Sequence, residues 1–228
     1  MQFFSFYRVL LVLTVIIITS NIFPQVRSYH SDCNLVFGSR ILYSSDYSAS
    51  MRQILEREGA DVSGPGFFYG FDAGVDFRLF SSIYLHPNIR WVFSSVTKTE
   101  RNGDASNSEF NSFVLPGIEA KMYFPIGETR LVYFGAGISS ASFSTNYQFG
   151  VEPKGISETI MLGFLFSFNW YNVGMELGYQ TIPMKSYVRR YTSYSLLSNS
   201  PDADFGGIYF SMNANIALFD YHKASADE

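Results

Sequence analysis

Charged side chains are scarce in this sequence, and its apolar runs are short. Only 16% of the 228 residues are Asp, Glu, Lys or Arg, whereas roughly a quarter are charged in an average soluble domain. Beyond the first 28 residues, no segment has the roughly 18 consecutive apolar residues that a transmembrane helix needs. The composition therefore fits neither an ordinary soluble domain nor a helical membrane protein.

Disulfides and the common site motifs are also missing. The only cysteine, Cys33, cannot form an internal disulfide, and we interpret it as incidental because the preceding Ser31-Asp32 does not resemble a lipoprotein signal. The sequence has no glycine-rich phosphate loop, no metal-ligand cluster and no nucleophile elbow. We therefore expect no cofactor and no bound metal.

The first 28 residues have the features of a secretory signal peptide. Met1–Arg8 carries one positive side chain, and the apolar core Val9–Ile18 is too short to span a bilayer comfortably. We predict that residues 1–28 are removed; the alternative is an uncleaved anchor. Their removal leaves 14 basic and 20 acidic residues, a net charge of −6, which argues against a nucleic-acid partner.

Aromatic residues are abundant, and apolar residues alternate with small or polar ones. Phe and Tyr number 23 and 16. In Gly66–Phe80 the odd positions are apolar, whereas the even positions from 70 to 78 are glycine, aspartate or arginine. Because a β-strand directs alternate side chains to opposite faces, this segment has one apolar face and one small or charged face.

The same period recurs and predicts eight strands. They cover about 35–44, 66–80, 83–94, 114–124, 132–139, 160–168, 173–180 and 208–218. Long connections (Ser45–Pro65, Lys98–Glu109, Thr145–Glu158, Met184–Phe205) alternate with tight turns (Phe80–Ser82, Pro125–Glu128, Asn169–Asn172). Such alternation is typical of outer-membrane barrels, whose turns are periplasmic and whose loops are extracellular. An even number of strands places both termini in the periplasm.

The tight turns also predict which residues lie opposite one another. The pairs are Asp72 with Arg90, Asp76 with His86, Arg78 with Tyr84, Lys121 with Tyr133, Glu119 with Gly135, Glu176 with Leu165, and Phe164 with Leu177. Charges of both signs thus share one face, and apolar residues share the other.

Three stretches carry a family resemblance: Tyr133–Gly137 (YFGAG), Val173–Tyr179 (VGMELGY) and the apolar final strand. Over about Leu35–Phe219 the chain resembles the eight-stranded outer-membrane barrel superfamily of OmpA-, OmpX- and OmpW-like domains. The resemblance implies an all-β, transmembrane, antiparallel up-and-down barrel (29–219) with a short periplasmic tail (220–228). It also implies a bacterial outer-membrane location and delivery by the outer-membrane assembly machinery.

One feature departs from that family. Its members often end on the aromatic residue that closes the last strand, but here nine residues follow Phe219, which is also out of phase with Leu218. Either the assembly machinery tolerates a tail, or the last strand shifts its register.

The charged residues of the polar face form the candidate interior site. They are Arg40, Asp72, Asp76, His86, Arg90, Glu119, Lys121 and Glu176. They could line a narrow ion path. We favour a salt-bridge network that fills the barrel, because eight strands leave room only for side chains and buried charges must be paired. Within it, we predict that Asp72 and Arg90 form an interior ion pair that closes the barrel. On the other face, we expect Phe71, Ile89, Phe134, Phe164 and Met212 to contact lipid.

An outer-membrane lipid A-modifying enzyme is the alternative function. His86 is the only histidine inside a predicted strand, Asp76 lies opposite it, and some eight-stranded barrels modify lipids with a His and a Ser or Asp. However, the alternation points His86 inward, away from lipid, and fixes no serine beside it. We therefore interpret His86 as an interior histidine and the protein as non-enzymatic: structural, adhesive, or a narrow small-solute channel.

Two connecting segments could contact partners. Ser48–Gly59 has helical spacing and could cap the barrel mouth or simply close its loop. Tyr187–Leu197 interleaves aromatics with arginines, which suits lipopolysaccharide but equally suits a continuation of two strands above the membrane. Outer-membrane lipids, lipopolysaccharide and an extracellular ligand of the loops are the expected partners. A soluble lipocalin-like carrier is a third and distant alternative. It also has eight antiparallel strands, but its loops do not alternate long and short so regularly.

Overall fold

The computed structural model describes residues 31–44, 60–63, 66–80, 82–100, 106–126, 129–145, 151–153, 155–168, 171–190, 193–196 and 203–219. The predicted signal peptide (1–28), the Ser48–Gly59 segment and the predicted tail (220–228) lie outside these residues. Within the described ranges, no helix is both long and apolar enough to cross a membrane.

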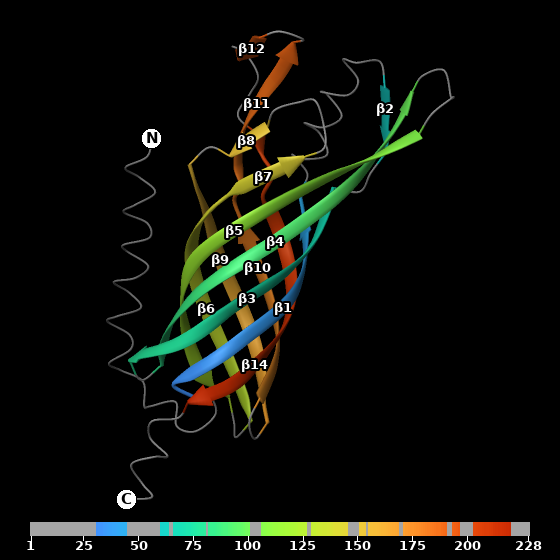
Figure 1. Ribbon diagram of the computed structural model, residues 1–228. Helices are drawn as coiled ribbons and strands as arrows, with labels where there is room; N and C mark the ends of the chain where they lie inside the picture. The colour runs from blue at the N-terminus through green and yellow to red at the C-terminus, as the bar shows by residue number, and fades with distance from the viewer. Residues whose placement is uncertain are drawn as a thin grey trace, which may run out of the picture.

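Eight long strands form a closed antiparallel barrel (Figure 1). They are β1 (Cys33–Tyr43), β3 (Phe67–Phe80), β4 (Ile83–Glu100), β5 (Ser106–Pro125), β6 (Arg130–Ser140), β9 (Ile156–Ser167), β10 (Tyr171–Gln180) and β14 (Gly207–Phe219). Each pairs with the next along the chain, and β14 returns to pair with β1. The predicted eight-stranded antiparallel up-and-down barrel is therefore confirmed.

The two ends of the barrel are named here by their connections. The β3–β4, β5–β6 and β9–β10 connections lie at the turn end, and the opposite end is the loop end. Cys33 pairs with Phe219, so β1 begins and β14 ends at the turn end.

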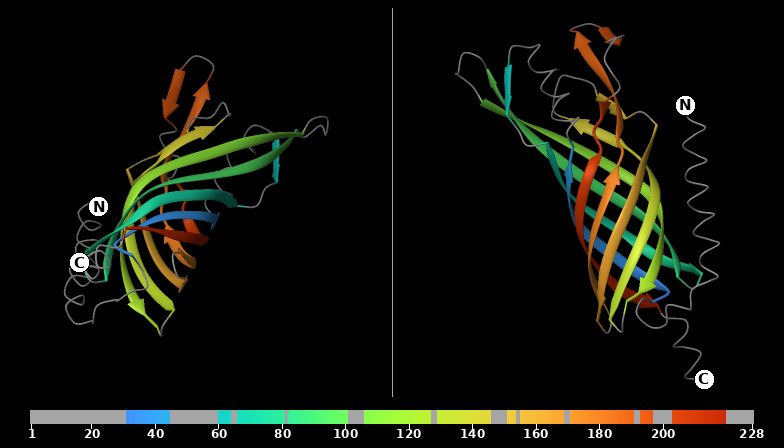
Figure 2. Two further views of the ribbon diagram at one scale, coloured as in Figure 1. Left: turned by 60° about the horizontal axis from the view of Figure 1, so that its bottom comes forward. Right: turned by 180° about the vertical axis from the view of Figure 1, so that it is seen from behind.

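Additional short strands lie at the loop end (Figure 2). Strand β2 (Ala60–Ser63) pairs with β4, and β7 (Ser142–Thr145) pairs with β5. Strands β8 (Val151–Pro153), β12 (Ser193–Leu196) and β13 (Ala203–Asp204) all pair with β11 (Pro183–Arg190). They form a second, smaller sheet.

The expected connection Lys98–Glu109 is mostly strand, which corrects the prediction. Strands β4 and β5 stay paired as far as Thr99 and Ser106. The alternation fails there because residues 97–100 are Thr, Lys, Thr and Glu. A strand beyond the barrel needs no apolar face, so the period of two disappears although the pairing continues. Likewise, Tyr187 pairs with Leu196, which matches the strand-continuation reading of Tyr187–Leu197.

One of the three predicted hairpin registers is correct. Asp72 lies opposite Arg90, and Arg78 opposite Tyr84. The other two are shifted by two residues, since Glu119 lies opposite Gly137 rather than Gly135.

In the third hairpin, Phe164 lies opposite Met175 rather than Leu177. The turns themselves explain both errors: Ile126 N donates to Arg130 O (2.8 Å), and Phe168 N donates to Tyr171 O (2.9 Å). The turn centres therefore differ from those assumed. A shift of two leaves every side chain on its predicted face, because that is the period of a strand.

The last strand does shift its register. Asn34 pairs with Ala217, but the preceding Cys33 pairs with Phe219. One extra residue, Leu218, is accommodated in β14 at this β-bulge. A change of register in the last strand was one of the two alternatives expected from the nine residues after Phe219, and it is present.

Candidate functional site

Nearly all the charged residues singled out above lie inside the barrel. Seven of them are no more than 4% exposed: Arg40, Asp76, His86, Arg90, Glu119, Lys121 and Glu176. The eighth, Asp72, has a side chain that is 10% exposed. The alternation explains this placement, because each of these residues occupies the lumen-facing phase of its strand. The lumen of the barrel is thus the candidate site.

Arg40 of β1 is held by groups from three other strands. Its Nη1 donates to Gln180 Oε1 at 3.0 Å. Its Nη2 lies 3.4 Å from Glu176 Oε1 and 3.5 Å from Asp72 Oδ2. The guanidinium carbon stands 3.8 Å from the centre of the Tyr209 ring. Two carboxylates, an amide and an aromatic face thus compensate a charge that would be costly to bury alone.

Glu176 of β10 is the acceptor at the centre of this group. Besides Arg40, it accepts hydrogen bonds from Tyr133 OH (2.6 Å) and Tyr209 OH (2.8 Å). Asn213 Nδ2 in turn donates to Tyr133 OH at 3.4 Å. Hydrogen bonds to an ionised acceptor are stronger than neutral ones, so these phenols fix the position of the carboxylate.

Asp76 of β3 forms a second centre nearer the turn end. His86 Nδ1 lies 2.7 Å from Asp76 Oδ1, and Tyr123 OH donates to Asp76 Oδ2 at 2.9 Å. Lys121 Nζ stands 3.8 Å from Asp76 Oδ1 and 3.7 Å from Glu119 Oε2. Lys121 therefore links Asp76 to the acid on its own strand.

Arg90 pairs with Glu119, which corrects the predicted Asp72–Arg90 ion pair. Asp72 and Arg90 are opposite in the β3–β4 ladder as expected. Their side chains nevertheless have other partners: Asp72 lies beside Arg40, and Arg90 beside Glu119 of β5. The strands of a closed barrel are tilted, so residues at equal height along its axis are not ladder partners.

The charges of this set nearly balance. Four carboxylates (Asp72, Asp76, Glu119 and Glu176) face three permanent cations (Arg40, Arg90 and Lys121). The fourth carboxylate, Asp76, lies beside His86 and accepts a hydrogen bond from Tyr123. A lumen filled in this way meets the requirement that buried charges be paired.

Glycines make room for the lumen-facing tyrosines. A Cβ at Gly163 would overlap the Tyr133 ring, and one at Gly178 would overlap the Tyr209 ring. Both tyrosines donate to Glu176, but neither was in the candidate set predicted from the sequence. The available signal was a tyrosine on an otherwise small and polar face, where its hydroxyl must find a partner.

An apolar layer lies between the charges and the loop end. It consists of Leu42, Phe68, Val92, Phe113, Leu115, Ile182, Met184 and Phe205, all fully buried. The Phe113 ring contacts those of Phe68 and Phe205 at 5.5 and 6.2 Å between centroids. The sequence reasoning did not identify this layer for two reasons. Four members occupy the nominally polar phase of their strands (Leu42, Phe68, Val92 and Leu115), and the other four lie outside the predicted strands.

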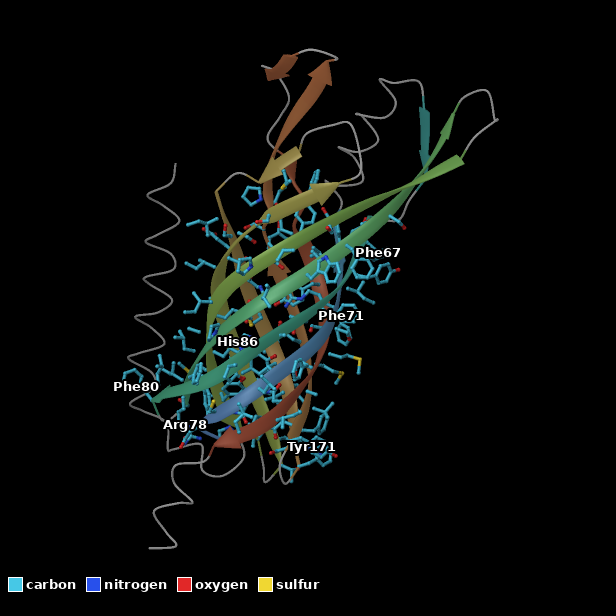
Figure 3. All side chains as sticks on the ribbon, in the orientation of Figure 1. Phe67, Phe71, Arg78, Phe80, His86 and Tyr171 are labelled. Carbon is cyan, nitrogen blue, oxygen red and sulfur yellow. The ribbon has the colours of Figure 1, made fainter. Side chains whose placement is uncertain are left out.

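The outer wall is apolar. Phe71, Ile89, Phe134 and Met212 are exposed, Phe71 to 59%, and Phe164 is partly exposed. Figure 3 shows Phe67 and Phe71 on the outside of the wall and His86 between its strands. Exposed apolar side chains in such numbers are unusual on a soluble protein.

The Asp76–His86 pair is the part of the lumen that the enzyme alternative would use. Within the described ranges, no serine or threonine hydroxyl bonds to the His86 ring, and Asp76 also contacts the phenol of Tyr123 and the ammonium of Lys121. No cluster of metal-binding side chains is found in that part of the chain. The pair is also buried inside the barrel, away from the outer wall that lipid would reach.

A solved structure of an outer-membrane protein shares this architecture. The outer membrane protein OprG from Pseudomonas aeruginosa matches with a TM-score of 0.55 and 10% identity, over 83% of this chain and 97% of that one. This is the fold of an outer-membrane β-barrel. The outer membrane protein AlkL matches with a TM-score of 0.43 and 9% identity, over 86% and 92% of the two chains.

A channel of Pseudomonas putida F1, the COG4313 outer membrane channel, matches with a TM-score of 0.31 and 7% identity, over 84% and 97% of the chains. No protein-family model matches the sequence, and no curated protein does. The narrower resemblance to OmpA-, OmpX- and OmpW-like domains stays a prediction.

Proposed function

We propose that this chain is a non-enzymatic bacterial outer-membrane protein whose lumen is closed by paired charges. The observation that carries the proposal is the distribution of side chains. The charges inside the barrel are buried and paired, whereas the outer wall is apolar. Water-soluble proteins bury apolar groups and expose charges. A lipid environment favours the arrangement seen here, because it solvates the apolar wall.

Aromatic residues on the outer wall support the membrane assignment. Tyr43, Tyr69 and Trp91 are exposed toward the loop end, and Phe80 and Phe168 toward the turn end. Aromatic girdles at both interfaces are a feature of outer-membrane barrels. The turn end would then be periplasmic, and the loop end extracellular.

A planar-bilayer recording tests whether the lumen is closed. We expect no steady current from the native chain, because the Arg40–Glu176 group fills the lumen. The double variant Arg40→Ala/Glu176→Ala should conduct, since it removes the two side chains at the centre of that group, although Asp72 then loses the cation beside it. Arg130→Ala, which alters an exposed arginine at the turn end, is the matched control. A native current equal to that of the double variant would contradict the closed lumen.

Lipid turnover separates this proposal from the enzyme alternative. The same vesicles, prepared with lipid A, should show no chemical change of that lipid. Turnover that disappears in His86→Gln but persists in Arg130→Ala would make the protein an enzyme.

The strands beyond the barrel favour a surface role. Strands β4 and β5 continue past the last β3–β4 pair, Tyr69 with Phe93, and β2 pairs with their extension. The second sheet around β11 lies at the same end. A closed barrel that carries this much β-structure at its extracellular end suits a structural or adhesive protein with an extracellular ligand, or one that contacts lipopolysaccharide.

A narrow small-solute channel is the second candidate. Asn88, Asn213 and Asn215 face the lumen, and the Oδ1 atom of each is buried without a hydrogen-bond partner among the described residues. Buried polar atoms of this kind are commonly satisfied by internal water. A steady native current that depends on solute size would favour this candidate.

A further inference from the structure

The chain just before β1 folds toward the lumen at the turn end. Asn34 is a buried, lumen-phase residue of β1. Its Nδ2 donates to Ser31 O at 2.8 Å, and Ser31 Oγ donates to Asn34 Oδ1 at 2.6 Å. Because Asn34 points into the lumen, these bonds hold Ser31 over the turn-end mouth.

Asp32 fixes the same segment to the neighbouring strand. Arg78 N donates to Asp32 O at 2.8 Å, which extends the β1–β3 ladder one step beyond the Cys33–Phe77 pair. The side chains meet as well, with Arg78 Nη1 2.8 Å from Asp32 Oδ1. They are 17% and 12% exposed, so this ion pair stands at the boundary between lumen and solvent. Figure 3 shows Arg78 at this end of the barrel.

These contacts continue inward to the charge network. Arg78 Nε donates to Tyr84 OH at 2.8 Å. The Tyr84 ring packs edge-on against Tyr123, with centroids 5.0 Å apart, and Tyr123 OH donates to Asp76. The segment before β1 is thus the outermost layer of one continuous stack of contacts.

We propose that Ser31–Asn34 is a strap that keeps the turn-end mouth of the lumen closed, fastened by the Asp32–Arg78 ion pair. The proposal rests on the proposed function, because a strap over the mouth matters only if the lumen behind it is closed. Without the Asp32 carboxylate, the Arg78 guanidinium loses the ion pair that joins it to the strap. The strap then loses its side-chain attachment to β3, and solvent enters the turn-end part of the lumen.

The single cysteine makes a thiol-accessibility experiment simple. In a Cys33→Ala background, Asn215→Cys places a thiol in the lumen near the strap. Asn215 is 2% exposed and pairs with Val36, and its Oδ1 has no partner among the described residues. Ser211→Cys on the same strand, opposite Arg40, places a second thiol farther from the mouth. Labelling by a bulky polar maleimide is timed in detergent.

We expect Asp32→Asn to speed labelling of the Asn215→Cys thiol about fivefold, the factor for a partly exposed ion pair. Labelling of the Ser211→Cys thiol should not change, because the network still lies between it and the mouth. Asp32→Glu should behave like the parent chain, since it keeps the charge. Arg130→Gln, a change at another turn-end arginine, should also have no effect. The circular dichroism of each variant reports whether it has folded.

Two results would overturn different parts of the argument. If folded Asp32→Asn and Arg78→Gln both label at the parent rate, the strap proposal is wrong, whatever the barrel conducts. If both thiols label fast in the parent chain and that chain carries a steady current, the lumen is open and the proposed function fails instead.

Discussion

Removing the Glu119 carboxylate should leave the Arg90 guanidinium stranded inside the barrel. Both residues are 2% exposed and form a direct ion pair. The remaining hydrogen bond of Arg90, Nη1 to Thr159 Oγ1 at 3.4 Å, is long and goes to a neutral group. Breaking a buried pair by truncating one partner costs about 3–5 kcal/mol. We therefore expect Glu119→Ala to lower the free energy of unfolding by an amount in that range.

A double-mutant cycle distinguishes this pair from the one that the ladder register suggests. Arg90→Ala/Glu119→Ala should show a coupling energy of about 1.5 kcal/mol or more, because the two side chains are in contact. Arg90→Ala/Asp72→Ala should show a smaller coupling energy, because Asp72 forms its ion pair with Arg40 instead. Both cycles contain Arg90→Ala, so any destabilisation that this variant causes by itself affects both equally.

Urea unfolding in lipid vesicles measures these energies. The midpoint and slope are followed for the single and double variants, with Arg130→Ala as the control for the loss of an exposed cation. That control should change stability by about 0.5 kcal/mol at most. Near-zero, additive losses in both cycles would refute the reasoning, because water would then be screening the surviving charge. The lumen would have to be solvated.

Three further predictions test other parts of the structure. Gly163→Ala should destabilise the barrel by about 1–3 kcal/mol in the same unfolding assay, because its Cβ would overlap the Tyr133 ring; an unchanged midpoint would mean that the ring moves freely. Replacing Phe71 or Ile89 by Arg should lower the free energy of unfolding by about 2–4 kcal/mol near the bilayer midplane, whereas replacement by Leu should change it little. Protection of these sites from lipid-soluble spin-label quenchers would contradict their contact with lipid. Mass spectrometry of the purified outer-membrane form should show a chain without residues 1–28. An intact Met1 would show that the signal peptide is retained.

The faces of the strands could be read from the sequence because the alternation is long and consistent. In β3 every odd position from 67 to 77 is apolar, and Phe71 is exposed while Asp76 is buried. A period of two has only two phases, so each strand of ordinary length offers many residues that agree on one of them. The charged residues of the lumen could therefore be predicted from the sequence, whereas the apolar layer could not.

The partners within that set could not be predicted, for two physical reasons. A register error of two residues leaves the faces unchanged, so the alternation could not reveal that Glu119 lies opposite Gly137. In addition, a long side chain reaches diagonally across a tilted barrel: Arg90 lies opposite Leu115 in the β4–β5 ladder but pairs with Glu119, nearer the turn end. Pairing therefore depends on tilt and stagger, which are properties of the closed sheet rather than of any one hairpin.

The charge network also bears on how the barrel closes. Replacing a buried ion pair with apolar residues of similar volume is often neutral or stabilising, so stability alone gives no reason for charges in this lumen. Arg40 stands on the first strand, and its partners Glu176 and Gln180 stand on β10, with the Tyr209 face from β14. Residues 40 and 176 are 136 positions apart. They meet only when β1 pairs with β14 in the native register, and a slip by one residue there would turn Arg40 toward lipid. Such a slip would be penalised far more heavily than one in an apolar lumen, because the misplaced guanidinium would lose its partners and meet hydrocarbon. The charge network thus favours the native register of the β1–β14 pairing, which joins the two barrel strands that are farthest apart in the chain.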